Sequence, residues 1–191
     1  IAQSMMTLAH LSKRAPILSI GPGERENIEP YGMPMHQRVG RLEEALQILR
    51  LCFTSLGPFS FQGQHYQLND AILDLKAPKD RTPEIWVAAH GPRMLGLTGK
   101  YADGWVPVAI ASPDDYAARL ATVREAARDA GRDPSAIFPA LQVYTVIAPT
   151  ESEARKMLKA KSVRFVALLA PANLWTQFGL THPFGNDFGG F

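Results

Sequence analysis

The sequence predicts an α/β fold built on a parallel sheet. Three observations favour it: continuously apolar runs of strand length, amphipathic runs with helical spacing between them, and short connections. Strands that are apolar on both faces are typical of parallel sheets covered on either side. The alternation of strand and helix predicts βα units, of which four are visible in the 191 residues.

The first half of the chain is predicted to contain a helix, a strand, a second helix and a hairpin. Apolar periodicity predicts a short helix over 2–12, and an apolar run predicts a strand over 16–21. Residues 37–53 carry apolar residues at spacings of three and four, which predicts an amphipathic helix with one buried stripe. Alternation on both sides of Gly63 then predicts a β-hairpin, an excursion from the βα order.

The second half continues the alternation. The run "EIWVAAHG" (84–91) predicts a strand, and Pro92 is placed to open the next helix. Residues 103–108 predict a third strand, followed by a helix that Ser112 caps. Residues 138–148 predict the fourth strand.

The last segment is predicted to be helical. Thr150 and Glu153 have the spacing of a capping box, and a further apolar helix is expected over about 163–171. Because no composition break marks a second domain, we expect residues 1–191 to form one domain. Apolar periodicity that has already begun at Ile1 suggests a domain that is incomplete at both ends.

Composition and charge argue against several classes of function. The net charge of +2 comes from 20 basic and 18 acidic residues without a dense basic stripe, so nucleic acid is not expected as a partner. No apolar run reaches the roughly 20 residues that span a bilayer. With the single Cys52, this leads us to expect a cytoplasmic protein. The histidines lack ligand spacing, so no metal site is predicted.

The stretch "LSIGPGERENIEPYG" (18–32) only begins like a dinucleotide-binding turn. That fingerprint needs a third small residue and an immediate helix, whereas Glu26 holds the third position and Pro30 interrupts any helix. The strand instead delivers Glu24 and Asn27 onto a loop at its carboxyl end, where parallel βα folds build ligand sites. A carboxylate there can exchange a proton, although a solvated loop has the same appearance.

A second strand-end turn, "AAHGPR" (88–93), strengthens the ligand-site interpretation. Small residues let a ligand approach, Gly91 permits a tight turn, and Pro92 starts a helix whose exposed N–H groups suit a phosphate. A plain strand-to-helix turn has the same pattern. His90 could face a substrate carbonyl, although histidines at such positions more often pack or cap.

Several motifs together resemble the bacterial-luciferase-like flavin and deazaflavin oxidoreductases. They are the 18–32 stretch, the Arg-Leu-Glu-Glu-Ala helix, the "FSFQGQHYQL" hairpin, "PEIWVAAHGPRMLGLTGKYADGW" and "DAGRDPSAI". Within this group the chain is most similar to the coenzyme F420-dependent branch of actinobacteria. Its last third, with "RFVALLAPANLW" and "HPFGNDFGGF", is similar to the phthiodiolone dimycocerosate ketoreductases of mycobacteria.

The resemblance implies a (β/α)8 TIM barrel of the luciferase-like type, here a partial barrel of units about four to seven with a β-hairpin insertion. It implies hydride transfer from reduced F420 to a carbonyl, with a small-molecule or long-chain lipid ketone as the substrate and a homodimer as the assembly. FMN is the alternative cofactor, with a monooxygenase reaction. A truncated, non-catalytic remnant that needs a partner chain is the alternative from a different class.

The resemblance also assigns roles to particular residues. Glu24 matches the carboxylate beside the deazaflavin ring, and Asn27 matches a polar residue near the cofactor's chain. The strand-end turn whose backbone holds the F420 phosphate is matched by Ala88, Ala89, His90 and Gly91. We therefore expect Glu24 and His90 to be catalytic, with Glu24 as a proton relay, a role that a partly buried carboxylate with a raised pKa could fill.

Overall fold

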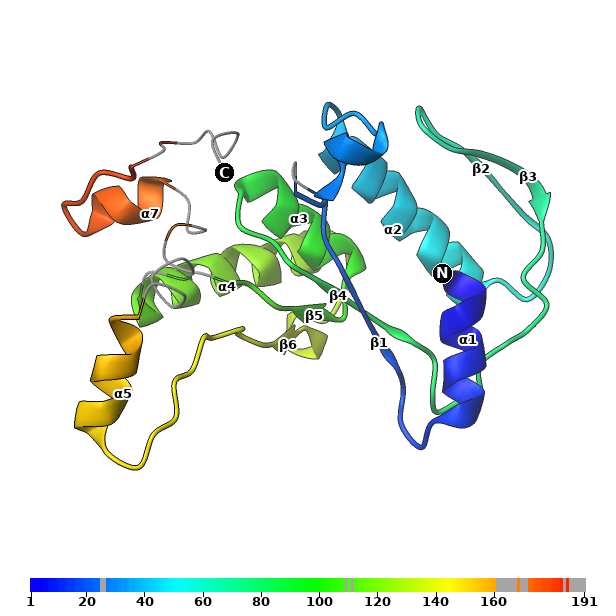
Figure 1. Ribbon diagram of the computed structural model, residues 1–191. Helices are drawn as coiled ribbons and strands as arrows, with labels where there is room; N and C mark the ends of the chain where they lie inside the picture. The colour runs from blue at the N-terminus through cyan, green and yellow to red at the C-terminus, as the bar shows by residue number, and fades with distance from the viewer. Residues whose placement is uncertain are drawn as a thin grey trace. The chain divides into compact units, whose positions relative to one another are not determined.

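The computed structural model describes residues 1–24, 27–108, 110, 112–160, 168, 172–183 and 185 (Figure 1). The chain forms two compact units. The first comprises residues 1–107 and 117–141, and the second comprises residues 108–116 and 142–191.

A four-stranded parallel sheet is the centre of the first unit. Its spatial order is β1-β4-β5-β6, and each neighbouring pair is parallel, as the sequence predicts. The strands are β1 (Ile17–Ile20), β4 (Glu84–Val87), β5 (Gly104–Trp105) and β6 (Phe138–Pro139).

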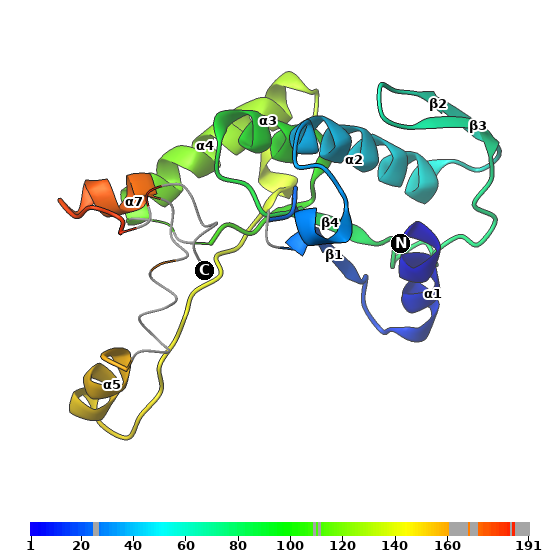
Figure 2. The ribbon, with the colours of Figure 1, turned by 45° about the horizontal axis from the view of Figure 1, so that its top comes forward.

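Helices cover one face of this sheet (Figures 1 and 2). They are α2 (Arg38–Thr54), α3 (Pro92–Tyr101) and the part of α4 (Pro113–Asp129) that follows Tyr116, while α1 (Ala2–Leu11) packs against α2. The predicted apolar stripe of α2 faces inward. The core between the layers contains the buried side chains of Leu42, Leu46, Leu49, Phe53, Ile85, Val87, Trp105, Val123 and Ala127.

The predicted helix starts are confirmed. Pro92 holds the first position of α3, where its missing N–H costs nothing. Ser112 Oγ accepts a hydrogen bond from Asp115 N–H at 3.1 Å and so caps α4. Of the helices in the described part of the chain, none is both long and apolar enough to cross a membrane.

The hairpin is confirmed as a separate two-stranded antiparallel sheet of β2 (Phe59–Gln62) and β3 (Gln67–Ala71). Glu44 of α2 anchors its turn. The carboxylate accepts backbone N–H bonds from Gln64, His65 and Tyr66 at 2.7, 2.9 and 2.9 Å. Desolvation by itself raises the pKa of Glu44, but these three donors together outweigh it and hold the pKa below its ordinary value.

Two strand expectations are wrong. The predicted burial of the first strand on both faces is not found, because helices cover only one face and Ile17 is 50% exposed. The predicted strand over 138–148 shrinks to Phe138–Pro139, since β5 offers only two residues for pairing. Beyond Pro139 the described chain is irregular up to Thr150, with Ile147 85% exposed, because apolar residues form a strand only where a partner completes the ladder.

Besides the first residues of α4, the described part of the second unit contains two short helices, α5 (Glu151–Leu158) and α7 (Ala172–Gln177). Thr150 and Glu153 form the predicted capping box of α5. The helix predicted over 163–171 lies outside the described residues, apart from Leu168.

Candidate functional site

The two sequence motifs meet at one edge of the parallel sheet. β1 and β4 are neighbours, and the pairing continues beyond them, because Ala88 N–H donates to the Ile20 carbonyl at 3.1 Å. A Cβ placed on Gly21 would lie 3.7 Å from the Cβ of Ala88. The loop after β1 and the turn after β4 therefore begin side by side, at the carboxyl edge where parallel βα folds bind ligands.

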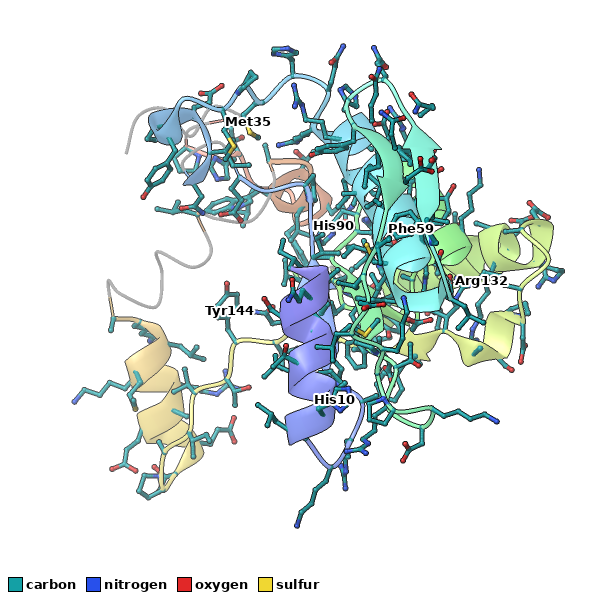
Figure 3. All side chains as sticks on the ribbon, turned by 90° about the vertical axis from the view of Figure 1, so that its right-hand side faces the viewer. His10, Met35, Phe59, His90, Arg132 and Tyr144 are labelled. Carbon is teal, nitrogen blue, oxygen red and sulfur yellow. The ribbon has the colours of Figure 1, made fainter. Side chains whose placement is uncertain are left out.

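Figure 3 places the labelled side chains relative to this edge. His90 and Met35, which follow β4 and β1 along the chain, lie toward the end of the sheet at which these strands finish. His10 lies toward the opposite end, where its Nε2 is 2.7 Å from the Lys76 carbonyl oxygen. His10 therefore belongs to the other end of the sheet.

Glu24 and Asn27 form a local pair on the first loop. The Asn27 backbone N–H donates to the Glu24 carbonyl, and its Nδ2 donates to Glu24 Oε2, both at 3.1 Å. Both residues are exposed, so Glu24 is not the partly buried carboxylate that would suit a proton relay. Gly23 precedes the pair with a φ of 77°, and a Cβ there would overlap the side chain of Ile28. The glycine thus bends the chain away from the strand.

The turn over 88–91 combines an anchored start with an open end. Ala89 is 1% exposed, whereas Gly91 is exposed and is the N-cap of α3. A Cβ on Gly91 would meet nothing within 4 Å. Within the described part of the chain, no group accepts a hydrogen bond from Gly91 N–H. An open glycine amide at a helix start is suited to an anionic group of a ligand.

Two side chains that sequence reasoning did not assign to the site hold this turn. Trp105 Nε1–H donates to the Ala89 carbonyl at 3.0 Å, and Arg119 Nη1–H donates to the His90 carbonyl at 2.9 Å. Trp105 is fully buried, and its role depends on a contact across the sheet that no local pattern encodes. The position of Arg119 could have been noticed in the sequence. It lies four residues before the buried Val123, on a helix face that is otherwise apolar.

The described residues also include a pocket, and Ile20 at the end of β1 is among the residues that line it. Its volume is about 630 Å³, and it lies between α1, α2 and the hairpin. Cys52 lines it, and burial raises the pKa of the Cys52 thiol, which disfavours the nucleophilic thiolate. Groups of three or more histidine, cysteine or acidic side chains that could hold a metal do not occur in the part of the chain that the structure describes.

Comparison with known proteins gives consistent results. The sequence model described as "Luciferase-like monooxygenase" matches residues 1–183. A phthiodiolone/phenolphthiodiolone dimycocerosates ketoreductase of Mycobacterium tuberculosis is 43% identical over 190 residues, which is 99% of this chain and 50% of that protein. An F420-dependent hydroxymycolic acid dehydrogenase of the same species is 31% identical over 159 residues, which is 81% of this chain and 42% of that protein.

A solved structure supports the fold. An F420-dependent secondary alcohol dehydrogenase, solved with an F420–acetone adduct, superposes with a TM-score of 0.74 at 23% identity and covers 93% of this chain and 64% of that one. The chain spans about half the length of the ketoreductase that it matches. The expected fold class, α/β of the luciferase-like barrel type, is confirmed, and the four-stranded parallel sheet is consistent with part of such a barrel.

Proposed function

Because the chain belongs to the luciferase-like monooxygenase family, we propose that the protein is an oxidoreductase that transfers a hydride from reduced F420 to a carbonyl. The observation that carries the proposal is that the loop after β1 and the turn after β4 begin side by side at one sheet edge, where Ala88 N–H donates to the Ile20 carbonyl and a Cβ on Gly21 would lie 3.7 Å from the Cβ of Ala88. The ketoreductase and the two F420-dependent dehydrogenases named above support the reaction class and the cofactor.

The residues at the edge fit such a cofactor. F420, when bound, supplies the hydride. The backbone of the turn, from Ala88 to Gly91, would hold the cofactor phosphate, and the open space at Gly91 would let an anion approach the amide. Asn27 would lie near the cofactor's chain. Its Nδ2 also orients the Glu24 carboxylate, through the 3.1 Å hydrogen bond.

Proton transfer is the protein's other task, because a carbonyl that receives a hydride must also receive a proton. We assign it to the carboxylate of Glu24, with the imidazole of His90 facing the substrate oxygen. The two residues lie on the connections that follow the neighbouring strands β1 and β4.

A titration with F420, monitored through the fluorescence of the cofactor, tests the cofactor assignment. We expect saturable binding that weakens at least roughly tenfold in Gly91→Val. The fold should tolerate that change, because nothing lies within 4 Å of a Cβ there. Gly57→Val is the matched control, since its surroundings are equally open. The assignment would be overturned if F420 did not bind, or if Gly91→Val and Gly57→Val bound F420 with equal affinity.

Turnover measurements test the proton relay. Glu24→Gln keeps the side chain's size and removes its proton-transfer capacity, so we expect kcat to fall about a hundredfold while the Kd for F420 changes little. Glu29→Gln on the same loop is the control. A pH–rate profile that is identical in wild type and Glu24→Gln would contradict the role.

We further propose a long-chain lipid ketone as the substrate, on the strength of the named substrate of the 43% identical relative. Measured kcat/KM values for a series of ketones of increasing chain length test this proposal. A rise with chain length supports it, and a preference for short ketones would redirect the assignment to small carbonyl substrates.

An FMN-dependent monooxygenase reaction is the second candidate. It is supported by the description of the matching family and by the shared chemistry of FMN and F420, both of which carry a phosphate for the 88–91 turn. Parallel titrations with FMN and F420 separate the two candidates, because only the true cofactor should saturate at low concentration. Oxygen consumption with reduced FMN would favour the monooxygenase.

Assembly completes the proposal. We propose a cytoplasmic homodimer in which residues 1–191 act as a single domain. Sedimentation equilibrium tests the dimer, and one cooperative thermal transition tests the single domain. A chain that binds neither cofactor and folds only with a different protein would instead support the non-catalytic remnant.

A further inference from the structure

We propose that Arg119 is a positioning residue for the cofactor phosphate: it holds the His90–Gly91 peptide so that the Gly91 N–H faces the anion. The inference rests on the proposed function, and it adds a residue that lies outside both sequence motifs. Arg119 belongs to α4, and it acts on the anion through the peptide that it holds and through its charge.

The geometry of the peptide bond carries the argument. In a trans peptide, the carbonyl and the following N–H point in opposite directions. The His90 carbonyl accepts the Arg119 guanidinium N–H at 2.9 Å, so the Gly91 N–H points away from α4. Space is available at this residue, because a Cβ on Gly91 would have no neighbour within 4 Å.

The preceding peptide is fixed in the same manner. The Ala89 carbonyl accepts the Trp105 indole N–H at 3.0 Å, so the His90 N–H points away from that indole. Two successive peptides are thus held by side chains from two later elements, β5 and α4. A turn whose carbonyls are held in place is preorganised, because binding need not rotate its peptides.

Arg119 also contributes through its charge. A hydrogen bond from a cation polarises the peptide that accepts it, which makes the N–H on the other side a better donor. The guanidinium in addition raises the electrostatic potential near the turn, which favours an anion. A glutamine at this position is a neutral donor. It would keep at most the hydrogen bond to the His90 carbonyl, and it would lose both the polarisation of the peptide by a cation and the positive potential near the turn.

The test compares ligands with and without the phosphate. We would measure Kd values for F420 and a phosphate-free deazaflavin, and for FMN and riboflavin, by fluorescence titration. FMN and riboflavin differ in the phosphate alone, so for this pair the ratio of the Kd of the phosphate-free ligand to that of the phosphorylated one reports the phosphate contribution. In Arg119→Gln we expect this ratio to fall about tenfold, with the Kd of the phosphate-free ligand nearly unchanged.

Two further variants keep the result interpretable. Arg119→Lys retains the cation and a donor and should recover part of the ratio, whereas Arg128→Gln, an exposed arginine on the same helix, should leave it at the wild-type value. A general structural role would weaken both ligands of a pair equally and leave the ratio unchanged, which would overturn the inference.

The outcomes also separate this inference from the proposed function. If the protein prefers FMN to F420, the cofactor assignment fails, and the FMN–riboflavin ratio still decides the role of Arg119. If wild type shows no preference for the phosphorylated member of either pair, the 88–91 turn binds no phosphate and the inference is overturned. If F420 binds with a phosphate preference that Arg119→Gln retains, only the inference fails.

Discussion

Trp86 and Phe138 stack across strand β5, with ring centroids 5.0 Å apart and ring planes inclined by 22°. They belong to strands that are not neighbours, and the residue paired with both of them is Gly104. A Cβ on Gly104 would lie 2.6 Å from an atom of the Trp86 indole, so the ring occupies the space that a side chain would fill. This contact joins β4 to β6 on the face of the sheet that the helices leave open.

Gly104→Ala should therefore destabilise the protein by about 1–3 kcal/mol, because the added methyl displaces the Trp86 indole. Urea denaturation measures the change. Gly57→Ala, at a glycine with nothing near its Cβ position, should stay within about 1 kcal/mol of wild type. If overlap with the Trp86 indole is the cause, Gly104→Ala should not destabilise a protein that already carries Trp86→Ala. An equal loss of stability in both backgrounds would contradict the overlap.

Alanine substitutions at two glycines of α3 should change the free energy of unfolding in opposite directions. A Cβ on Gly99 would lie 2.3 Å from the Val123 carbonyl oxygen, so Gly99→Ala should force α3 and α4 apart at a cost of about 1–3 kcal/mol. Gly96→Ala, where nothing lies within 4 Å, should instead stabilise the helix by about 0.5–1 kcal/mol. Thermal unfolding of both variants measures the two changes. Shifts in Tm of the same sign would contradict the close approach of the two helices at Gly99.

Asp103 should be a sensitive charged position, because its carboxylate joins three partners. Its carboxylate accepts from Arg50 at 2.7 Å, from Arg132 at 3.5 Å and from the Ile85 N–H at 2.9 Å. Burial and the neighbouring Arg50 lower the pKa of Arg132, so removal of the carboxylate leaves two guanidiniums in mutual repulsion.

We expect Asp103→Asn to lose about 1–3 kcal/mol of unfolding free energy, measured by urea denaturation. Asp80→Asn is the control, because the Asp80 side chain is 81% exposed and pairs only loosely with Arg81, at 3.5 Å. An exposed pair of this kind contributes about 0–1 kcal/mol. Equal losses in the two variants would argue against the network.

The hairpin anchor predicts a pH dependence. The pKa of Glu44 is lower in the folded state than its ordinary value of 4.5, so its contribution is fully present above that value and is lost as the pH falls through the folded pKa. The protection factors for amide exchange at Gln64, His65 and Tyr66, which are corrected for the intrinsic pH dependence of exchange, should fall as the anchor protonates. Glu44→Gln should show low protection factors at every pH, whereas Glu43→Gln, which loses the pair with Arg93, should behave like wild type.

The fold class and most element boundaries followed from local pattern. Spacing predicted α2, alternation about Gly63 predicted the hairpin, and the Thr150–Glu153 capping box marked the start of α5, because each depends on residues close in sequence. The 138–148 segment was mispredicted because a strand exists only where a neighbour pairs with it. That neighbour, β5, is distant in sequence and only two residues long.

For the candidate site, the sequence alone determined the two motifs and their place at strand ends, because βα order fixes which loops follow which strands. Only the tertiary structure decided that Gly21 lies against Ala88, that Glu24 is exposed, and that Trp105 and Arg119 hold the 88–91 turn. These contacts depend on sheet register and on where α4 crosses the sheet. Both are set by the packing of distant residues rather than by any local run of sequence.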